Sequence, residues 1–335
     1  MFQRSPFASS WKAVARSVVG AGHLSQNLPC QDACLYRRQP SGLLLGAVAD
    51  GAGSAAYSQL GAELAVRESL DYLARWETFL QRRRRRFLPW LKDLTPDQRR
   101  KFFAKLLRFL RRSLACLAAQ EGVEYKSLAS TLLVFIAGPE GVAAMQIGDG
   151  FMVVRAQTGD YELLFHPDKG EYINETTFIT SANALEDIQS SVYERSPHFI
   201  CAATDGLEKV AIKYQDWSAF GPFFQPLETF LTEIKDPEAE DEYLQNFLQS
   251  ERLNQRTQDD KTLLIALALP PAPPPRPPQQ RRVVPKSPPR RPSRPIQRIA
   301  PDRSETGEDS LTGKPSRDIL AGGLPEGPLP PWLED

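Results

Sequence analysis

Hydrophobic positions in the first 269 residues follow two periods, and one of them is typical of buried strands. Several short runs are rich in Val, Ile, Leu, Phe and Ala and are bounded by Gly, Asp or Pro. These runs are LLLGAVAD (43–50), STLLVFIAG (130–138), GVAAMQIGDGFMVVRA (141–156), HFICAATDG (198–206) and KTLLIALAL (261–269). A further short strand, ACLYRR, is predicted at 33–38.

The second period is helical and lies mainly between the first two long strands. Apolar residues recur there every three or four positions, in one stripe of Ala62, Val66, Leu70 and Leu73 and another of Phe103, Leu106, Leu110, Leu114 and Leu117. Each stripe predicts an amphipathic helix packed on a sheet. A later helical stretch covers 242–253. This order predicts an α+β layered sandwich with mostly antiparallel sheets, and not alternating βαβ units.

The composition changes near residue 269. Of the 29 prolines, 18 lie between Pro270 and Pro331, in a segment with few large apolar residues. Such a segment cannot bury enough surface to offset its ordering entropy. We therefore expect a folded domain at 1–268 and a disordered, proline-rich tail at 269–335. PPAPPPRPP (270–278) has a PxxPxR spacing that suits a proline-recognising domain, although a stiff, solvated spacer is the commoner use of such a sequence.

Charge and cysteine content narrow the class of protein. The 41 basic and 41 acidic residues cancel, so the composition favours neither nucleic acid nor a membrane as partner. The five arginines at 82–86 lack interleaved aromatic residues, which predicts a solvated helix end or loop. No apolar run is long enough to span a bilayer, and the first residues lack the apolar centre of a secretory signal, so we expect a cytoplasmic protein. The four cysteines form no CxxC pair and are expected to be reduced and mostly buried.

Aspartates stand at the ends of several predicted strands. They are Asp32, Asp50, Asp149, Asp205 and the pair Asp259–Asp260. A single Asp-Gly pair is most often a turn. Acidic residues at the ends of stacked strands can converge, however, and clustered carboxylates repel one another unless cations neutralise them. Oxygen ligands suit Mg²⁺ or Mn²⁺, and three histidines without a CxxC pair argue against zinc or copper.

The order of the motifs resembles the metal-dependent Ser/Thr protein phosphatases of the PPM type, the protein phosphatase 2C-like group. The motifs are PCQDA (29–33), VADGAGS (48–54), STLLVFI (130–136), QIGDG (146–150), ATDG (203–206) and QDDKTLLIAL (258–267). His23 and GEYINETTF (170–178) are similar to a bacterial branch of that group. The resemblance covers about 11–268 and implies a four-layer α-β-β-α sandwich with two packed antiparallel sheets.

The resemblance also implies two Mg²⁺ or Mn²⁺ ions and a set of ligands. The ligands would be Asp32, Asp50, Gly51, Asp205 and Asp259. Asp50 would bridge the ions and Gly51 would offer its carbonyl oxygen, while Asp32 would act through a metal-bound water. Asp32 and Asp50 are therefore the expected catalytic residues.

Other matching positions carry weaker expectations. Asp149 is a candidate ligand for a third metal ion, with a simple turn as an equal alternative. Ser130 and Thr131 are expected to pack or to support a ligand, and not to act as nucleophiles. Asp260 stands where the family commonly has Asn, and Gln31 stands where many members have Glu, which removes one negative charge.

Two departures concern the substrate. Many members have an arginine that binds the substrate phosphate where this chain has Asn27, and some have a histidine proposed as general acid where it has Ala52. His23 is the expected phosphate contact in their place, with Arg155 as an alternative. Neither departure affects an expected metal ligand.

The resemblance implies hydrolysis of phosphoserine and phosphothreonine in proteins by a metal-bridging hydroxide. The alternative is a catalytically weak, metal-binding module that recognises phosphoproteins; Asn27 favours it, and the retained carboxylates oppose it. A scaffold role would rest on the tail alone and would leave the carboxylates unexplained. We expect a monomer whose partners are phosphorylated proteins and a cognate Ser/Thr kinase.

Overall fold

Two five-stranded antiparallel sheets form the centre of the fold. The computed structural model describes residues 11–165, 176–234 and 241–269. The first sheet has the order β1-β12-β9-β6-β7 and the second has the order β2-β3-β4-β5-β8. The strands are β1 (Trp11–Val18), β2 (Ala33–Arg38), β3 (Leu44–Ala49), β4 (Leu132–Gly138), β5 (Gly141–Ile147), β6 (Phe151–Ala156), β7 (Glu162–Leu163), β8 (Gln189–Tyr193), β9 (Pro197–Ala203) and β12 (Lys261–Ala268). β10 (Ile212–Lys213) and β11 (Ser218–Ala219) form a separate small pair.

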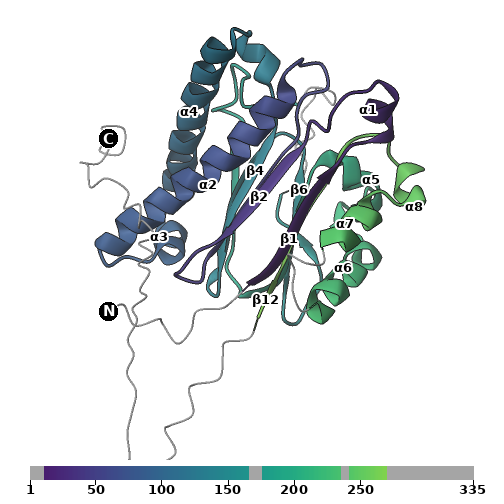
Figure 1. Cartoon of the computed structure of the whole chain (residues 1–335). Coiled ribbons are helices and arrows are strands. Elements are labelled where there is room, and N and C mark those ends of the chain that lie inside the picture. The colour runs from purple at the N-terminus through teal and green to yellow at the C-terminus, as the bar shows by residue number, and fades with distance from the viewer. Residues whose placement is uncertain (1–10, 166–175, 235–240, 270–335) are drawn as a thin grey trace, which may run out of the picture. The chain divides into compact units, whose positions relative to one another are not determined.

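Helices cover the outer faces of both sheets (Figure 1). On the second sheet they are α2 (Ser58–Arg82), α3 (Phe87–Asp93) and α4 (Pro96–Glu121), and on the first sheet α6 (Gly221–Glu233) and α7 (Asp241–Leu248). The shorter elements are α1 (Ala21–Ser25), η1 (Tyr125–Leu128), η2 (Asp205–Leu207), α5 (Glu208–Ala211) and α8 (Glu251–Asn254). The expected four-layer α-β-β-α sandwich is therefore confirmed.

Strand β12 illustrates why the strands are continuously apolar. Leu264 and Ala266 belong to the core between the two sheets, whereas Leu263, Ile265 and Leu267 belong to the core between the first sheet and its helices. Successive side chains of a strand point to opposite faces, so a strand that is covered on both faces needs apolar residues at every position.

The two predicted helical stripes are found in α2 and α4. The apolar residues of both stripes are buried, apart from the half-buried Leu117. Helix α4 begins with a capping box formed by Thr95 and Gln98 and is followed by Gly122 in the left-handed conformation, with φ 67°. Helix α2 ends at Arg82, and the side chains of residues 82–86 are exposed, as expected.

Some elements differ from the prediction. The run 141–156 divides into β5 and β6, which belong to different sheets, and Gly148 turns the chain between them with φ 97°. The pattern at 242–253 divides into α7 and α8, and α6 was not predicted. Only Cys201 is buried, while Cys116 is exposed and Cys30 and Cys34 are half-buried, so the expectation of mostly buried thiols is wrong.

Two further expectations concern other parts of the chain. Within the described ranges, no helix has the length and apolar character needed to cross a membrane. The proposed tail, from residue 270 on, and residues 170–175 of GEYINETTF lie outside the described residues.

Candidate metal centre

Strand ends from both sheets meet at one edge of the sandwich. Asp50 follows β3, Asp205 follows β9, and Asp149 lies between β5 and β6. Ala33 at the start of β2 is paired with Ala49 at the end of β3. In the other sheet, Ala203 at the end of β9 is paired with Phe151, the first residue of β6, and with Leu263, near the start of β12. The antiparallel register therefore brings the predicted aspartates to the same edge.

Three of these carboxylates form a compact cluster. One ligand oxygen from each of Asp50, Asp149 and Asp205 lies within 4.8 Å of the others, and all three residues are partly exposed. Asp149 also accepts a hydrogen bond of 2.6 Å from the Thr176 hydroxyl. The candidate third-metal residue therefore lies in the same cluster as the candidate bridging residue.

Asp32 is only 6% exposed, and its charge acts on Asp50 of the cluster. The Thr204 hydroxyl donates to its Oδ2 at 2.8 Å. Its Oδ1 is buried and has no hydrogen-bond partner among the residues that the structure describes, and the same holds for Oε1 of the neighbouring Gln31. A buried acceptor without a donor loses a hydrogen bond unless water or an ion supplies a partner, so both oxygens are available to a cation or its water.

The carboxylates also perturb one another electrostatically. Burial, followed by the negative charges of Asp32 and Asp205, raises the pKa of Asp50 to about 11. Burial and the charges of Asp149 and Asp259 raise the pKa of Asp205 to about 7. Burial is also the main cause that raises the pKa of Asp32 to about 7. Among the described residues, no positive charge is one of the largest influences on these three pKa values, and the all-oxygen donor set fits Mg²⁺ or Mn²⁺.

The backbone around Asp50 is held tightly. The Asp50 amide donates to the Thr131 hydroxyl at 2.9 Å, and the Thr131 amide donates to the Asp50 carbonyl oxygen at 2.8 Å. A Cβ on Gly51 would lie 2.6 Å from the Gln31 carbonyl oxygen and 2.9 Å from Cβ of Ser58. Glycine is therefore required here for close packing. Ser130, also expected to support the site, is fully buried.

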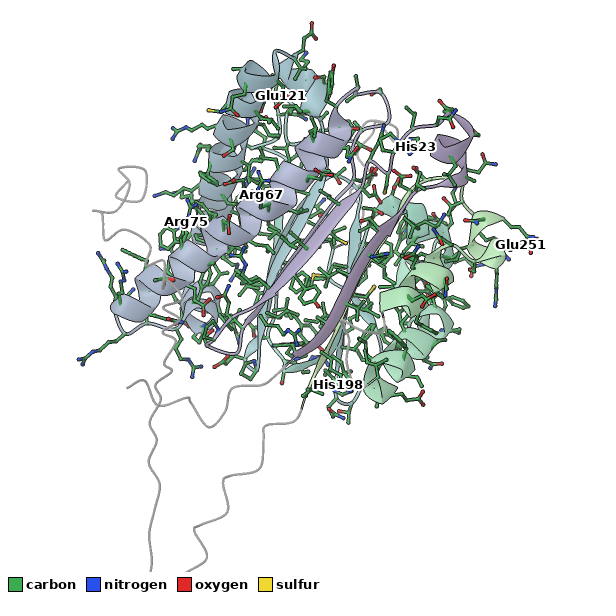
Figure 2. All side chains as sticks on the ribbon, viewed as in Figure 1. His23, Arg67, Arg75, Glu121, His198 and Glu251 are labelled. Carbon is green, nitrogen blue, oxygen red and sulfur yellow. The ribbon has the colours of Figure 1, made fainter. Side chains whose placement is uncertain are left out.

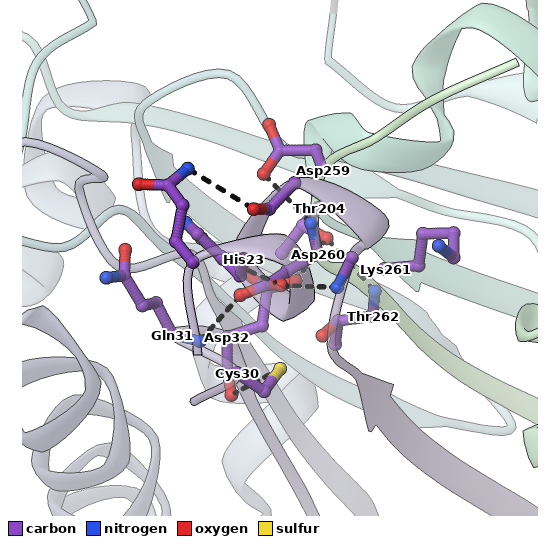
Figure 3. A network of polar contacts seen from close by, with 12 residues as sticks. His23, Cys30, Gln31, Asp32, Thr204, Asp259, Asp260, Lys261 and Thr262 are labelled. Carbon is purple, nitrogen blue, oxygen red and sulfur yellow. Dashed lines mark hydrogen bonds and ion pairs between the residues drawn. The ribbon is translucent and has the colours of Figure 1, made fainter. Parts of the chain in front are cut away.

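The two neighbouring aspartates before β12 have different environments. Asp259 is exposed, and its Oδ1 accepts a hydrogen bond of 2.9 Å from the amide of the next residue. Asp260 is 2% exposed, and both of its oxygens accept backbone hydrogen bonds. Figure 3 shows Asp260 inside this network of polar contacts. Of the two, Asp259 has the more available carboxylate.

The residues considered for substrate phosphate lie in different places. Nδ1 of His23 lies 2.9 Å from Oδ1 of Asp260, the residue that directly follows the expected ligand Asp259. Arg155 lies near the other end of β6, where its Nε donates to Oε2 of Glu228 at 2.9 Å. Asn27 is exposed, with φ 55°, and Ala52 is 6% exposed. His23 is therefore near the carboxylates, whereas Arg155 is held away from them.

Sequence reasoning missed the two threonines that support Asp32. Thr204 donates to Asp32, and its hydroxyl accepts a hydrogen bond of 3.2 Å from the Thr262 amide. Both residues are buried and lie within motifs already singled out, ATDG and QDDKT. Thr204 directly precedes the expected ligand Asp205, and Thr262 lies three positions after the expected ligand Asp259, so a threonine close to an expected ligand was the available signal.

Comparisons with known proteins agree with this architecture. A sequence model of the protein phosphatase 2C family matches residues 19–249. Serine/threonine-protein phosphatase 3 of Escherichia coli K12 is 36% identical over 266 residues, which cover 77% of this chain and 98% of the relative.

Solved structures share the fold at low sequence identity. Serine/threonine phosphatase Stp1 from Staphylococcus aureus superposes with a TM-score of 0.51 at 13% identity, covering 81% of this chain and all of that one. A variant of a bacterial serine phosphatase gives a TM-score of 0.50 at 15% identity, covering 78% and 100%.

Proposed function

The chain belongs to the protein phosphatase 2C family, and we propose from this that it hydrolyses phosphoserine and phosphothreonine in proteins with the help of two Mg²⁺ or Mn²⁺ ions. The observation that carries the proposal is the cluster of Asp50, Asp149 and Asp205, whose ligand oxygens lie within 4.8 Å of one another at the meeting point of both sheets. A recognition module would not need this concentration of uncompensated negative charge.

The proposed ligands follow the family motifs. They are Asp50 and Asp205 of the cluster, the exposed Asp259 and the carbonyl of Gly51, with Asp32 acting through its unpartnered Oδ1 and Asp149 offering a place for a third ion. When bound, the ions lower the pKa of a shared water and neutralise charge on the phosphoryl group.

The chain's own groups then have separate tasks. Thr204 fixes Oδ2 of Asp32, which leaves Oδ1 to accept a proton from a water at the centre. We assign His23 to the substrate phosphate, because a ring beside the carboxylates can donate a hydrogen bond to a phosphate oxygen. Thr131 keeps Asp50 in place through its backbone.

The test is turnover of a phosphothreonine peptide by the purified chain. We expect turnover with Mn²⁺ or Mg²⁺ and none in excess EDTA. Full activity in the chelator would contradict the two-metal proposal. Tight peptide binding without turnover, at saturating Mn²⁺, would instead support the alternative of a recognition module.

The biological setting is also a proposal. We assign the activity to residues 1–268, and we propose a cytoplasmic monomer that acts on proteins phosphorylated by a Ser/Thr kinase. The PxxPxR spacing at 271–276 supports a proline-recognising partner for the tail. Co-purification of a Ser/Thr kinase, or of its substrates, with an inactive variant would test the partner assignment.

A further inference from the structure

Asp260 is a buried carboxylate that the proposed metal site does not use, and it joins segments far apart in sequence. Its Oδ1 accepts a hydrogen bond of 2.7 Å from the Gly20 amide, and its Oδ2 accepts one of 2.6 Å from the Gln31 amide. His23 Nδ1 lies 2.9 Å from the same Oδ1. Figure 3 shows His23, Gln31 and Asp260 in one network of polar contacts.

These contacts hold the segment 20–31 at both of its ends. Gly20 begins the segment, and Gln31 ends it directly before Asp32. A Cβ on Gly20 would lie 2.3 Å from the backbone carbon and oxygen of Asp259, so the absence of a side chain allows this close approach. The Gly22 amide adds a hydrogen bond of 2.9 Å to the Gln258 carbonyl oxygen. Between the two ends, most residues of the segment are exposed.

Both oxygens of Asp260 are needed for this arrangement. Each accepts from a different backbone amide, and an asparagine side chain has only one acceptor oxygen. An amide at this position would place an N–H₂ group against a buried N–H donor, which carries the desolvation cost of an unmade hydrogen bond. The carboxylate can therefore accept both backbone hydrogen bonds, whereas asparagine, its closest isostere, can accept only one of them.

We infer that Asp260 is a positioning residue that fixes His23 against the metal centre, so that His23 can contact the substrate phosphate. The inference rests on the proposed function for the phosphate itself. It adds that Asp260 acts on substrate binding through His23, and not as a metal ligand. His23 has a side chain that is 16% exposed, so its ring can be reached by a substrate while the carboxylate behind it stays buried.

The experiment is a double-mutant cycle with His23→Gln, Asp260→Asn and the double variant. Two matched controls alter the same residue types elsewhere. Asp71→Asn removes a carboxylate of α2 that pairs with Arg37 on β2, and His198→Gln removes the histidine 3.3 Å from Glu228. Measurements are KM and kcat for a phosphothreonine peptide with Mn²⁺, calorimetric binding of inorganic phosphate to the Mn²⁺-loaded protein, and thermal unfolding in EDTA.

Each single variant is expected to raise KM about tenfold with little change in kcat, as for the loss of one hydrogen bond to a charged group. The double variant should be no worse than the worse single variant, because both changes remove the same contact. Phosphate affinity should fall in parallel. Asp260→Asn should also lower the melting temperature in EDTA, whereas the controls should leave KM unchanged.

Three results would overturn the inference. The first is a KM effect in the double variant that equals the product of the two single effects. The second is an unchanged KM in Asp260→Asn. The third is an unchanged KM in His23→Gln, which can be measured even if Asp260→Asn does not fold. Failure of the proposed function is distinguishable, because the wild type would then turn over no phosphopeptide. In that case the phosphate titration and the unfolding in EDTA still test the contact between Asp260 and His23.

Discussion

Carboxylates lie at both ends of the strands of the sandwich, and the pKa values at the two ends are shifted in opposite directions. Near the start of β9, Glu228 accepts hydrogen bonds from Arg155 at 2.9 Å and from the Tyr161 hydroxyl at 2.6 Å, and His198 lies 3.3 Å away. At the other end the carboxylates of the metal centre face one another. Figure 2 shows His198 and His23, which mark these two ends.

The pKa values follow this difference. Burial alone would raise the pKa of Glu228, but the hydrogen bonds from Arg155 and Tyr161 outweigh it and hold the pKa below its usual range. Burial and neighbouring carboxylates instead raise the pKa of Asp50 to about 11. The protein itself compensates the charge at the Glu228 end, so that cluster is structural. Among the described residues, no cationic side chain pairs with Asp50, Asp149 or Asp205, and that cluster is where we propose that cations bind and the chemistry takes place.

The largest expected effect comes from Asp50→Asn at the uncompensated end. The amide loses the charge and offers one acceptor oxygen, so Mn²⁺ affinity and turnover should fall together by at least about a hundredfold. Stability in EDTA should stay the same or rise, because one member of a repelling cluster is gone. Calorimetric Mn²⁺ titration, phosphopeptide turnover and thermal unfolding measure these quantities. Unchanged Mn²⁺ binding would rule out the bridging role.

Glu228→Gln makes the matching change at the compensated end. It removes the partner of Arg155 and weakens a hydrogen bond to a charged group, so the free energy of unfolding should fall by about 2 kcal/mol. Mn²⁺ affinity and turnover should remain those of the wild type. Denaturant unfolding and the same metal titration provide the measurement. A loss of turnover comparable to that of Asp50→Asn would show that the two ends do not have separate roles.

A smaller effect is expected from pH in the metal-free protein. The raised pKa values of Asp32 and Asp205, both about 7, mean that the native state holds protons that the unfolded chain has already lost. Stability in EDTA should therefore fall as pH rises from 5 to 8, and the melting temperature should fall with it by several degrees. Saturating Mn²⁺ should flatten this slope.

His198 contributes in the opposite direction, because burial lowers its pKa and its neutral form is favoured in the native state. The pH series is therefore repeated in His198→Gln, where the downward slope should be steeper. A melting temperature in EDTA that rises from pH 5 to 8 in both proteins would contradict the uncompensated state of the cluster.

The smallest effect is expected from removing residues 270–335. The last strand, β12, ends at Ala268 and pairs with β1 and β9 along its length. The truncated chain should keep its melting temperature within about 2 °C, since changes outside packed and hydrogen-bonded groups are usually small. Turnover of a small aryl phosphate should also be kept. A large loss of stability would place the tail in the core of the domain.

Much of the fold was predictable because its signals are local. The buried faces were predicted from the apolar stripes of α2 and α4 and from the continuous apolar runs of the long strands. Helix α6 was missed because Pro222 and Pro226 interrupt its pattern, although proline is tolerated at the start of a helix. The division of 141–156 between two sheets was also missed. A glycine such as Gly148 indicates a turn, but it does not indicate which sheet the next strand joins.

By itself, the sequence determined the layered fold and the placement of aspartates at strand ends, because strand periodicity and motif order are properties of the sequence that do not depend on tertiary contacts. Only the tertiary structure decided what each carboxylate does. Asp259 and Asp260 are adjacent and chemically identical. Asp259 is exposed, however, whereas Asp260 accepts hydrogen bonds from backbone amides 229 and 240 positions away. Thr204 likewise reaches Asp32 across 172 positions. Hydrogen bonds of this range exist only once the sheets have packed, because packing alone brings such distant segments together.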